Sequence, residues 1–175
     1  IHRGSFPLFN AKKHFTRGFC SKFPKEIKNR IKQNGLRNVS ISTIAPNGSL
    51  SIIAQCSSGC EPIFALNYKR NVMLGKDDKK EFVIHHPGVI RNFYYTKAEK
   101  LSDCWITAHN IDYDYRIKLQ SILQKHVDSS ISSTINLPKD ATSQSVSDIY
   151  FKAWKENLKG ITVYREGSRE GVLIT

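Results

Sequence analysis

The loop between residues 46 and 50 carries the clearest chemistry in the sequence, because its main-chain N–H groups could bind an anion. The loop consists of Pro46, Asn47, Gly48, Ser49 and Leu50. It follows an alternating apolar stretch, Val39–Ala45, that predicts a strand, and it precedes a short apolar run typical of a helix. The first N–H groups of a helix have no intrahelical partner and lie at the positive end of its dipole. The hydroxyls of Ser49 and Ser51 add two donors. This arrangement predicts a phosphate site.

The same residues also fit an ordinary β-to-α turn, or a hairpin, since Asn-Gly is a favoured two-residue hairpin turn. If a helix follows the loop, Ser49 is its expected N-cap. Gly59 and Pro62 are the expected end of that helical piece.

The elements that must position this loop alternate between helices and strands. A helix is expected from Pro24 to Gly35, and a second begins at Pro87. An extended stretch, 63–74, a polar turn, 75–78, and a returning strand, 81–84, predict a β-hairpin.

The last third of the sequence predicts a strand, a helix and a strand in parallel, with a longer helix before them. That longer helix begins at Asp112 or Asp114 and runs to about Ser129. Its expected inward residues are Ile117, Leu119, Ile122, Leu123 and Val127. A strand follows at 131–137. The next helix is capped by Thr142 or Ser143, and a buried strand follows at 161–164. The apolar stripe of that helix comprises Val146, Ile149, Tyr150, Ala153, Trp154 and Leu158.

Composition sets wider limits. The chain has 175 residues and a net charge of +12, which favours anionic partners. No apolar run is long enough to span a bilayer. The four cysteines, Cys20, Cys56, Cys60 and Cys104, do not suggest a disulfide scaffold. Cys56 and Cys60 are interpreted as buried or half-buried thiols, with a metal or redox role as the less favoured alternative. His85 and His86 are neighbours on a strand and face opposite ways, so a surface or capping role is expected, and no metal site is predicted.

Several segments, taken together, resemble the large chain of ribonucleotide reductase, most closely the adenosylcobalamin-dependent class II enzyme. The longest is APNGSLSIIAQCSSGCEPIFALNYKR, from Ala45 to Arg70. The others, in the family's order, are GSFPLF (4–9), TAHNI (107–111), QKHVDSSISSTINLP (124–138) and KGITVYREGSREGVL (159–173). They cover nearly all of the chain. At Tyr164-Arg165, relatives that receive their radical from a second subunit carry two tyrosines, so Arg165 resembles the cobalamin-dependent branch.

The resemblance implies an α/β fold, the C-terminal part of a ten-stranded α/β barrel with a β-hairpin insertion and flanking helices. It implies that residues 1–175 are one incomplete segment of the catalytic barrel domain. The matching loop of the family holds substrate phosphates through backbone N–H groups, which assigns that role to Pro46, Asn47, Gly48, Ser49 and Leu50. The family's radical cysteine, its neighbouring asparagine and glutamate, and its reducing cysteine pair lie outside the matched region. No catalytic residue is therefore assigned, and the chain alone is expected to be inactive.

The resemblance implies that the chain is a portion of a cytoplasmic enzyme that converts ribonucleoside diphosphates to deoxyribonucleotides for DNA synthesis. The implied partners are adenosylcobalamin, the rest of the catalytic chain and a thiol reductant such as thioredoxin, with a homodimer allowed. No membrane and no direct nucleic-acid contact are expected. Two alternatives stay open: a non-catalytic nucleotide- or phosphate-binding module of the same fold, and a basic nucleic-acid-binding protein, ranked last because Lys and Arg occur along the whole chain.

Overall fold

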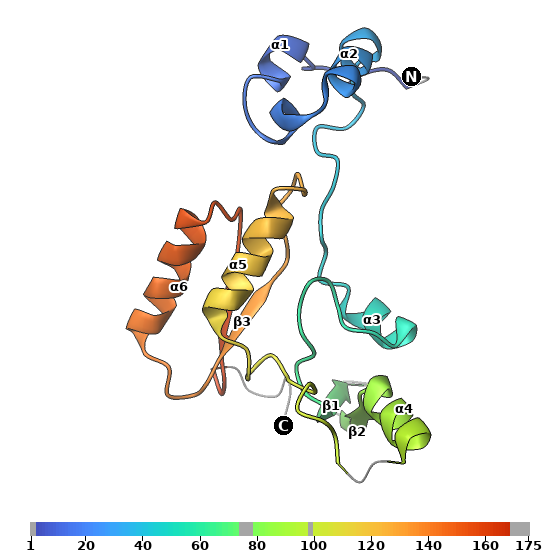
Figure 1. Ribbon diagram of the computed structural model, residues 1–175, viewed down its shortest axis with the longest axis vertical. Coiled ribbons are helices and arrows are strands. Elements are labelled where there is room, and N and C mark those ends of the chain that lie inside the picture. The colour runs from blue at the N-terminus through green and yellow to red at the C-terminus, as the bar shows by residue number, and fades with distance from the viewer. Residues whose placement is uncertain (1–2, 74–78, 98–99, 169–175) are drawn as a thin grey trace.

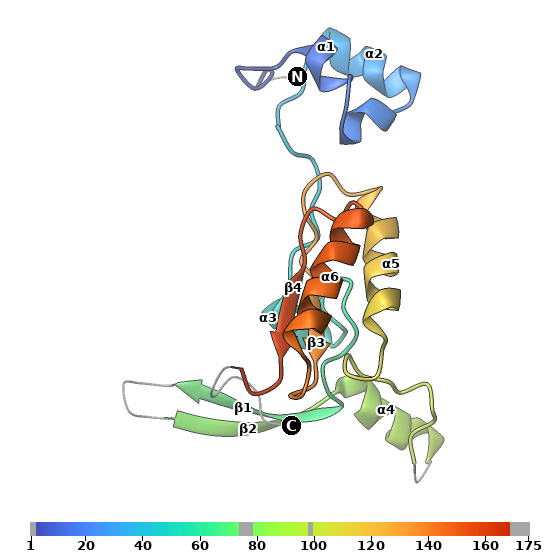
Figure 2. The same ribbon diagram turned by 90° about the vertical axis from the view of Figure 1, so that its left-hand side faces the viewer.

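The computed structural model describes residues 3–73, 79–97 and 100–168, which form a mixed α/β structure. An N-terminal lobe, residues 3–37, stands apart from the rest and is joined to it by an extended segment (Figures 1 and 2). The lobe contains α1 (Ala11–His14), the 3-10 helix η1 (Phe19–Lys22) and α2 (Lys25–Asn34). Pro24 is the N-cap of α2 and Gly35 ends it in the left-handed region, at φ 75°, so the predicted helix is confirmed.

The parallel pairing predicted at the C-terminal end is confirmed, but the last strand, predicted to be buried, has two exposed and two half-buried residues. β3 (Thr134–Leu137) and β4 (Thr162–Arg165) pair in parallel, and α6 (Ser143–Lys155) connects them. α5 (Tyr113–Gln124) lies beside α6 (Figure 2). Four buried apolar residues form the core between the helices and strands: Ile117, Ile135, Leu137 and Ile149. Burial of such side chains is the main driving force for this packing.

The strand predicted at 39–45 is reduced to an isolated parallel bridge between Ile44 and Ile131. The Ser132 amide donates to the Ile44 carbonyl at 2.9 Å, so this segment runs beside the chain that enters β3. Farther back, one main-chain bond, from the Ser129 amide to the Ser42 carbonyl at 2.8 Å, is joined by a side-chain bond from the Ile41 amide to Asp128 Oδ2 at 3.0 Å. Val39 and Ile41 are also exposed, so no apolar face holds a longer strand in register. The described residues form no closed barrel.

A smaller unit follows the extended segment. It contains α3 (Gly48–Ala54), the antiparallel strands β1 (Asn67–Met73) and β2 (Lys79–His85), and α4 (Pro87–Thr96). The returning strand predicted at 81–84 therefore lies within β2, whereas the predicted turn at 75–78 lies outside the described residues. Pro87 occupies the first turn of α4, as predicted. No helix in the described part of the chain is long and apolar enough to cross a membrane.

Two predicted helix faces need correction. α5 ends at Gln124 rather than near Ser129, and Leu119 and Ile122 are exposed. Its buried face is largely polar and comprises Arg116, Ile117, Gln120, Ser121 and Gln124. On α6, Ile149 and Ala153 are buried, but Tyr150 and Trp154 are 48% and 69% exposed. A 3.6-residue pattern shows that a helix has apolar residues on one side, but it does not show which of them the neighbouring element covers.

Candidate functional site

The predicted anion loop starts a helix, two residues earlier than expected. Asn47 adopts the left-handed conformation, at φ 52°, which asparagine tolerates better than most residues, and Gly48 is the first residue of α3. The first bond of the ladder runs from the Ser51 amide to the Asn47 carbonyl at 2.8 Å. The N–H groups of residues 48–50 therefore have no partner within α3. Ser49 is in the first turn and is not the N-cap, which corrects that assignment.

Two further details of this helix differ from the prediction. The Ser51 hydroxyl donates to the Gly48 carbonyl at 2.7 Å, so its proton is used within the turn rather than offered to a ligand. α3 ends at Gln55, which is left-handed at φ 55°, and not at Gly59. α3 has seven residues, about two turns. Its N-terminus is therefore too short to define an anion site by itself.

The loop borders a cavity of about 870 Å³. Gly48 and Ser49 line it, and the parallel strands line it along their length, through Thr134 and Asn136 of β3 and Thr162 and Tyr164 of β4. Pro46, Asn47 and Leu50 do not line this cavity. The structure thus places two of the five predicted residues at its wall.

A buried arginine and a glutamate hold β3 beside this cavity. The Thr134 amide donates to Oε1 of Glu61, and the Thr134 carbonyl accepts a hydrogen bond from Nη2 of Arg116 at 3.0 Å. Arg116 is 4% exposed and also donates to the Ser133 hydroxyl at 3.4 Å. Both main-chain groups of Thr134 are therefore fixed by side chains from other segments.

The Glu61 carboxylate also acts electrostatically on Arg116. Burial lowers the pKa of Arg116, and the Glu61 carboxylate opposes that change by favouring the charged guanidinium. A buried charge of this kind is stable only when it is paired and hydrogen-bonded. The sequence predictions missed both residues. A signal existed, since Arg116, Gln120 and Gln124 recur every four residues and interrupt the apolar stripe of the predicted helix.

The four cysteines are all free thiols. Burial raises the pKa of Cys20 and of Cys60, which favours the protonated thiol over the reactive thiolate. Cys60 is half-buried, as interpreted, but Cys56 is exposed, which corrects that interpretation. Cys20 is buried and Cys104 is exposed. In the described residues, no group of three or more His, Cys, Asp and Glu side chains could hold a metal ion.

The two neighbouring histidines have separate roles. Nδ1 of His85 lies 2.6 Å from Oδ1 of Asn67, across the β1–β2 pair. Nδ1 of His86 accepts from the Gly88 amide at 3.1 Å and caps α4, which confirms the predicted capping role. The His86 ring also lies edge-on to Trp105, 6.3 Å between centroids. Both rings line the cavity, but each has its Nδ1 engaged.

The chain is similar to known proteins over nearly its whole length. The family model described as "Ribonucleotide reductase, barrel domain" matches residues 1–164. A vitamin B12-dependent ribonucleoside-diphosphate reductase of Mycobacterium tuberculosis is 34% identical over 87% of this chain and 25% of its own length. A protein of the same name from Thermoplasma acidophilum is 34% identical over 99% of this chain and 24% of its own length. The alpha subunit of a ribonucleoside-diphosphate reductase from Treponema pallidum is 25% identical over 88% of this chain. The chain thus spans about a quarter of the length of the first two relatives.

Proposed function

This chain belongs to the ribonucleotide reductase barrel domain family, and we propose that it is a portion of a vitamin B12-dependent ribonucleoside-diphosphate reductase. In this proposal residues 1–175 are one segment of the catalytic barrel. Their contribution is to hold the substrate's phosphates, and the radical cysteine and the reducing cysteines lie elsewhere in the longer protein. The longer protein converts ribonucleoside diphosphates to deoxyribonucleotides.

The observation that carries this proposal is the position of Gly48 and Ser49 on the cavity wall. Their N–H groups have no partner within α3, and the Ser49 hydroxyl lies in the same turn. Backbone N–H groups and a hydroxyl are suitable donors for phosphate oxygens. We propose that Pro46, Asn47 and Leu50 act by fixing the shape of the loop, because they do not line the cavity. Asn47 does so through its left-handed conformation and through Nδ2, which donates to the Ala45 carbonyl at 3.1 Å.

The resemblance implies adenosylcobalamin for the longer protein, where it would supply the radical when bound. Both histidines at the cavity have Nδ1 engaged, with Asn67 and with the Gly88 amide, and we assign no described residue to the cofactor. Arg165 supports the cobalamin-dependent branch of the family, because a guanidinium cannot carry a radical as a tyrosine does. In the structure this guanidinium donates to the Lys139 carbonyl at 3.3 Å.

The remaining partners follow from the same assignment. The longer protein would take a ribonucleoside diphosphate and a thiol reductant such as thioredoxin, act in the cytoplasm, and could form a homodimer. The names of the M. tuberculosis and T. acidophilum relatives support the substrate and the cofactor.

Turnover by two preparations tests the proposal. The longer protein that carries this segment should reduce a ribonucleoside diphosphate when supplied with adenosylcobalamin and dithiothreitol. The 175-residue chain alone should not, because the residues that handle the radical lie elsewhere. No turnover by the longer protein would favour the alternative, a non-catalytic phosphate-binding module of the same fold. Turnover by the short chain would refute the assignment of catalysis to other segments.

A further inference from the structure

The positive charge of the chain is concentrated in the N-terminal lobe. Residues 1–37 contain ten of the 27 Lys and Arg residues but only one of the 15 Asp and Glu residues, Glu26. Their net charge is +9, whereas the other 138 residues carry 17 basic and 14 acidic residues, a net charge of +3. The expectation of no nucleic-acid contact relied on an even spread of Lys and Arg. The counts show that the spread is uneven.

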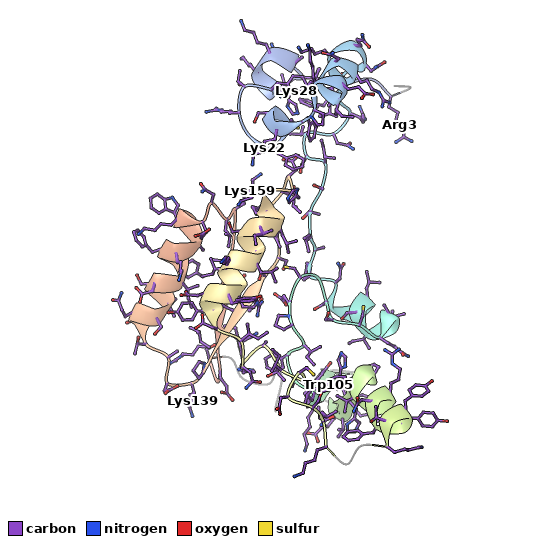
Figure 3. The ribbon with its side chains drawn as sticks, viewed as in Figure 1. Arg3, Lys22, Lys28, Trp105, Lys139 and Lys159 are labelled. Atoms are coloured by element: carbon purple, nitrogen blue, oxygen red, sulfur yellow. The ribbon has the colours of Figure 1, made fainter. Side chains whose placement is uncertain are left out.

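The structure presents this charge to solvent. Nine of the ten basic side chains are exposed: Arg3, Lys12, Lys13, Arg17, Lys22, Lys25, Arg30, Lys32 and Arg37. Lys28 is half-buried, and its ammonium donates to the Ser21 carbonyl. Within residues 3–37, no basic side chain forms an ion pair with a carboxylate. Figure 3 shows Arg3, Lys22 and Lys28 on the lobe, which stands away from the parallel strands.

The aromatic rings of the lobe are half-buried and pack on one another. The rings of Phe6 and Phe9 meet edge-on with centroids 5.5 Å apart, and both contact His14. Phe19 and Phe23 form a second edge-on pair, 5.3 Å apart. Within residues 3–37, the exposed large apolar side chains are Leu8 and Ile27. The outside of the lobe is therefore basic and polar, with few apolar anchors.

We propose that the N-terminal lobe binds the phosphate backbone of double-stranded nucleic acid, without reading its sequence. Duplex DNA carries one charge per about 1.7 Å of axis, which suits a surface with many separate cations. Single strands are recognised largely by stacking bases on exposed aromatic rings, and here the rings pack on one another. Membrane-surface helices insert a continuous apolar face, which Leu8 and Ile27 do not form. This inference concerns a different surface from the phosphate cavity and does not depend on the proposed function.

Fluorescence anisotropy of a labelled 20-bp DNA duplex, titrated with the 175-residue chain at several KCl concentrations, tests the proposal. The lobe variant replaces Lys12, Lys25 and Lys32 with Gln; all three side chains are exposed. The matched control replaces Lys118, Lys125 and Lys139, which are exposed outside the lobe, and removes the same charge.

We expect salt-dependent binding by the unaltered chain and a loss of affinity of about tenfold or more in the lobe variant at about 50 mM KCl. The slope of log affinity against log salt should fall by about 0.9 for each lysine that contacts a phosphate, and the control should change little. The proposal is overturned if the chain does not bind the duplex at low salt. Equal losses in both variants would overturn it too, as would binding confined to phosphatidylserine vesicles.

Discussion

At the scale of single residues, Thr134 is held most specifically, because its amide donates to Glu61 and its carbonyl accepts from Arg116. Arg116→Met should lower the free energy of unfolding by about 1–3 kcal/mol, because it leaves the Thr134 carbonyl and the Ser133 hydroxyl without their buried donor. Glu61→Gln should cost less, since its amide oxygen can still accept from the Thr134 amide.

Urea denaturation of the chain at low micromolar concentration measures both changes. Lys152→Met is the control, since it removes a surface ion pair with Asp114 and should have a much smaller effect. Equal losses from Arg116→Met and Lys152→Met would contradict the buried role of Arg116.

His86 gives a prediction about pH. Burial lowers the pKa of His86 below its value in the unfolded chain, and the charge of Arg91 adds to this effect. Between the lowered pKa and about 6.5, the unfolded state binds more protons than the folded state, so stability rises with pH. The contribution of His86 is therefore complete above about pH 6.5 and is lost as the pH falls toward the lowered value.

Thermal melting at pH 5.5 and pH 7.5 checks this directly. The unaltered chain should melt at a higher temperature at pH 7.5, and His86→Asn, which can still cap α4, should reduce the difference. His126→Asn, an exposed site, is the control. The same pH dependence in His86→Asn and the unaltered chain would show that other groups cause it.

At the scale of elements, α5 contains two isoleucines that were both predicted to face inward, and only one of them does. Ile117 is fully buried in the core, whereas Ile122 is 49% exposed. Ile117→Ala should destabilise the chain by about 2–5 kcal/mol, because it leaves a cavity among Ile135, Leu137 and Ile149. Ile122→Ala should change stability by about 0.5 kcal/mol or less. Chemical denaturation of the two variants compares them, and equal effects would contradict the observed face of α5.

Local sequence signals predicted these elements well where a cap or a turn defines them. Pro24 and Gly35 bracket α2, Asp112 caps α5 and Thr142 caps α6 through bonds within a few residues. The direction of a helix face and the length of the strand before Pro46 depend on distant segments. The hydrogen bond between Ile41 and Asp128 spans 87 positions, and the bonds from Arg116 to Ser133 and Thr134 span 17 and 18. The polar residues of α5 repeat every four positions, but no local pattern shows which distant segment they contact.

The candidate site shows the same division. The loop and the helix start were predicted, but the cavity needs residues from several segments, and only Gly48 and Ser49 of the five loop residues line it. The position of Tyr164 on the wall follows from the pairing of β3 with β4, which sets Asn136 opposite Tyr164. The sequence predicted that pairing. It did not predict which side chains the pairing turns toward the loop.

At the scale of the whole molecule, the described surface includes several large exposed apolar side chains. Phe151 and Trp154 stack on the outside of α6, with centroids 5.7 Å apart, and are 55% and 69% exposed. We expect the isolated chain to associate as its concentration rises, because contiguous exposed apolar surface favours association. Light scattering after size exclusion measures this. Replacing both residues with Ser should reduce association, whereas a monodisperse monomer across the concentration range would contradict the expectation.

The central claim is that the loop from Pro46 to Leu50 binds substrate phosphates, and nucleotide titration of loop variants in the longer protein tests it most directly. A Cβ added at Gly48 meets no other atom within 4 Å, so Gly48→Val should fold normally while its side chain occupies space at the cavity wall. Ser49→Ala removes one hydroxyl and should cost at most about 1.5–3 kcal/mol of binding free energy. Ser143→Val and Ser143→Ala are matched controls in the first turn of α6, outside the cavity.

Isothermal titration calorimetry with a ribonucleoside diphosphate, and with the nucleoside lacking its phosphates, measures the dissociation constants. We predict that Gly48→Val raises the constant for the diphosphate by about tenfold or more, a loss of about 1.4 kcal/mol, and leaves the constant for the nucleoside nearly unchanged. The Ser143 variants should bind both ligands like the unaltered protein. Unchanged diphosphate affinity in a well-folded Gly48→Val variant would contradict the assignment of this loop to the substrate phosphates.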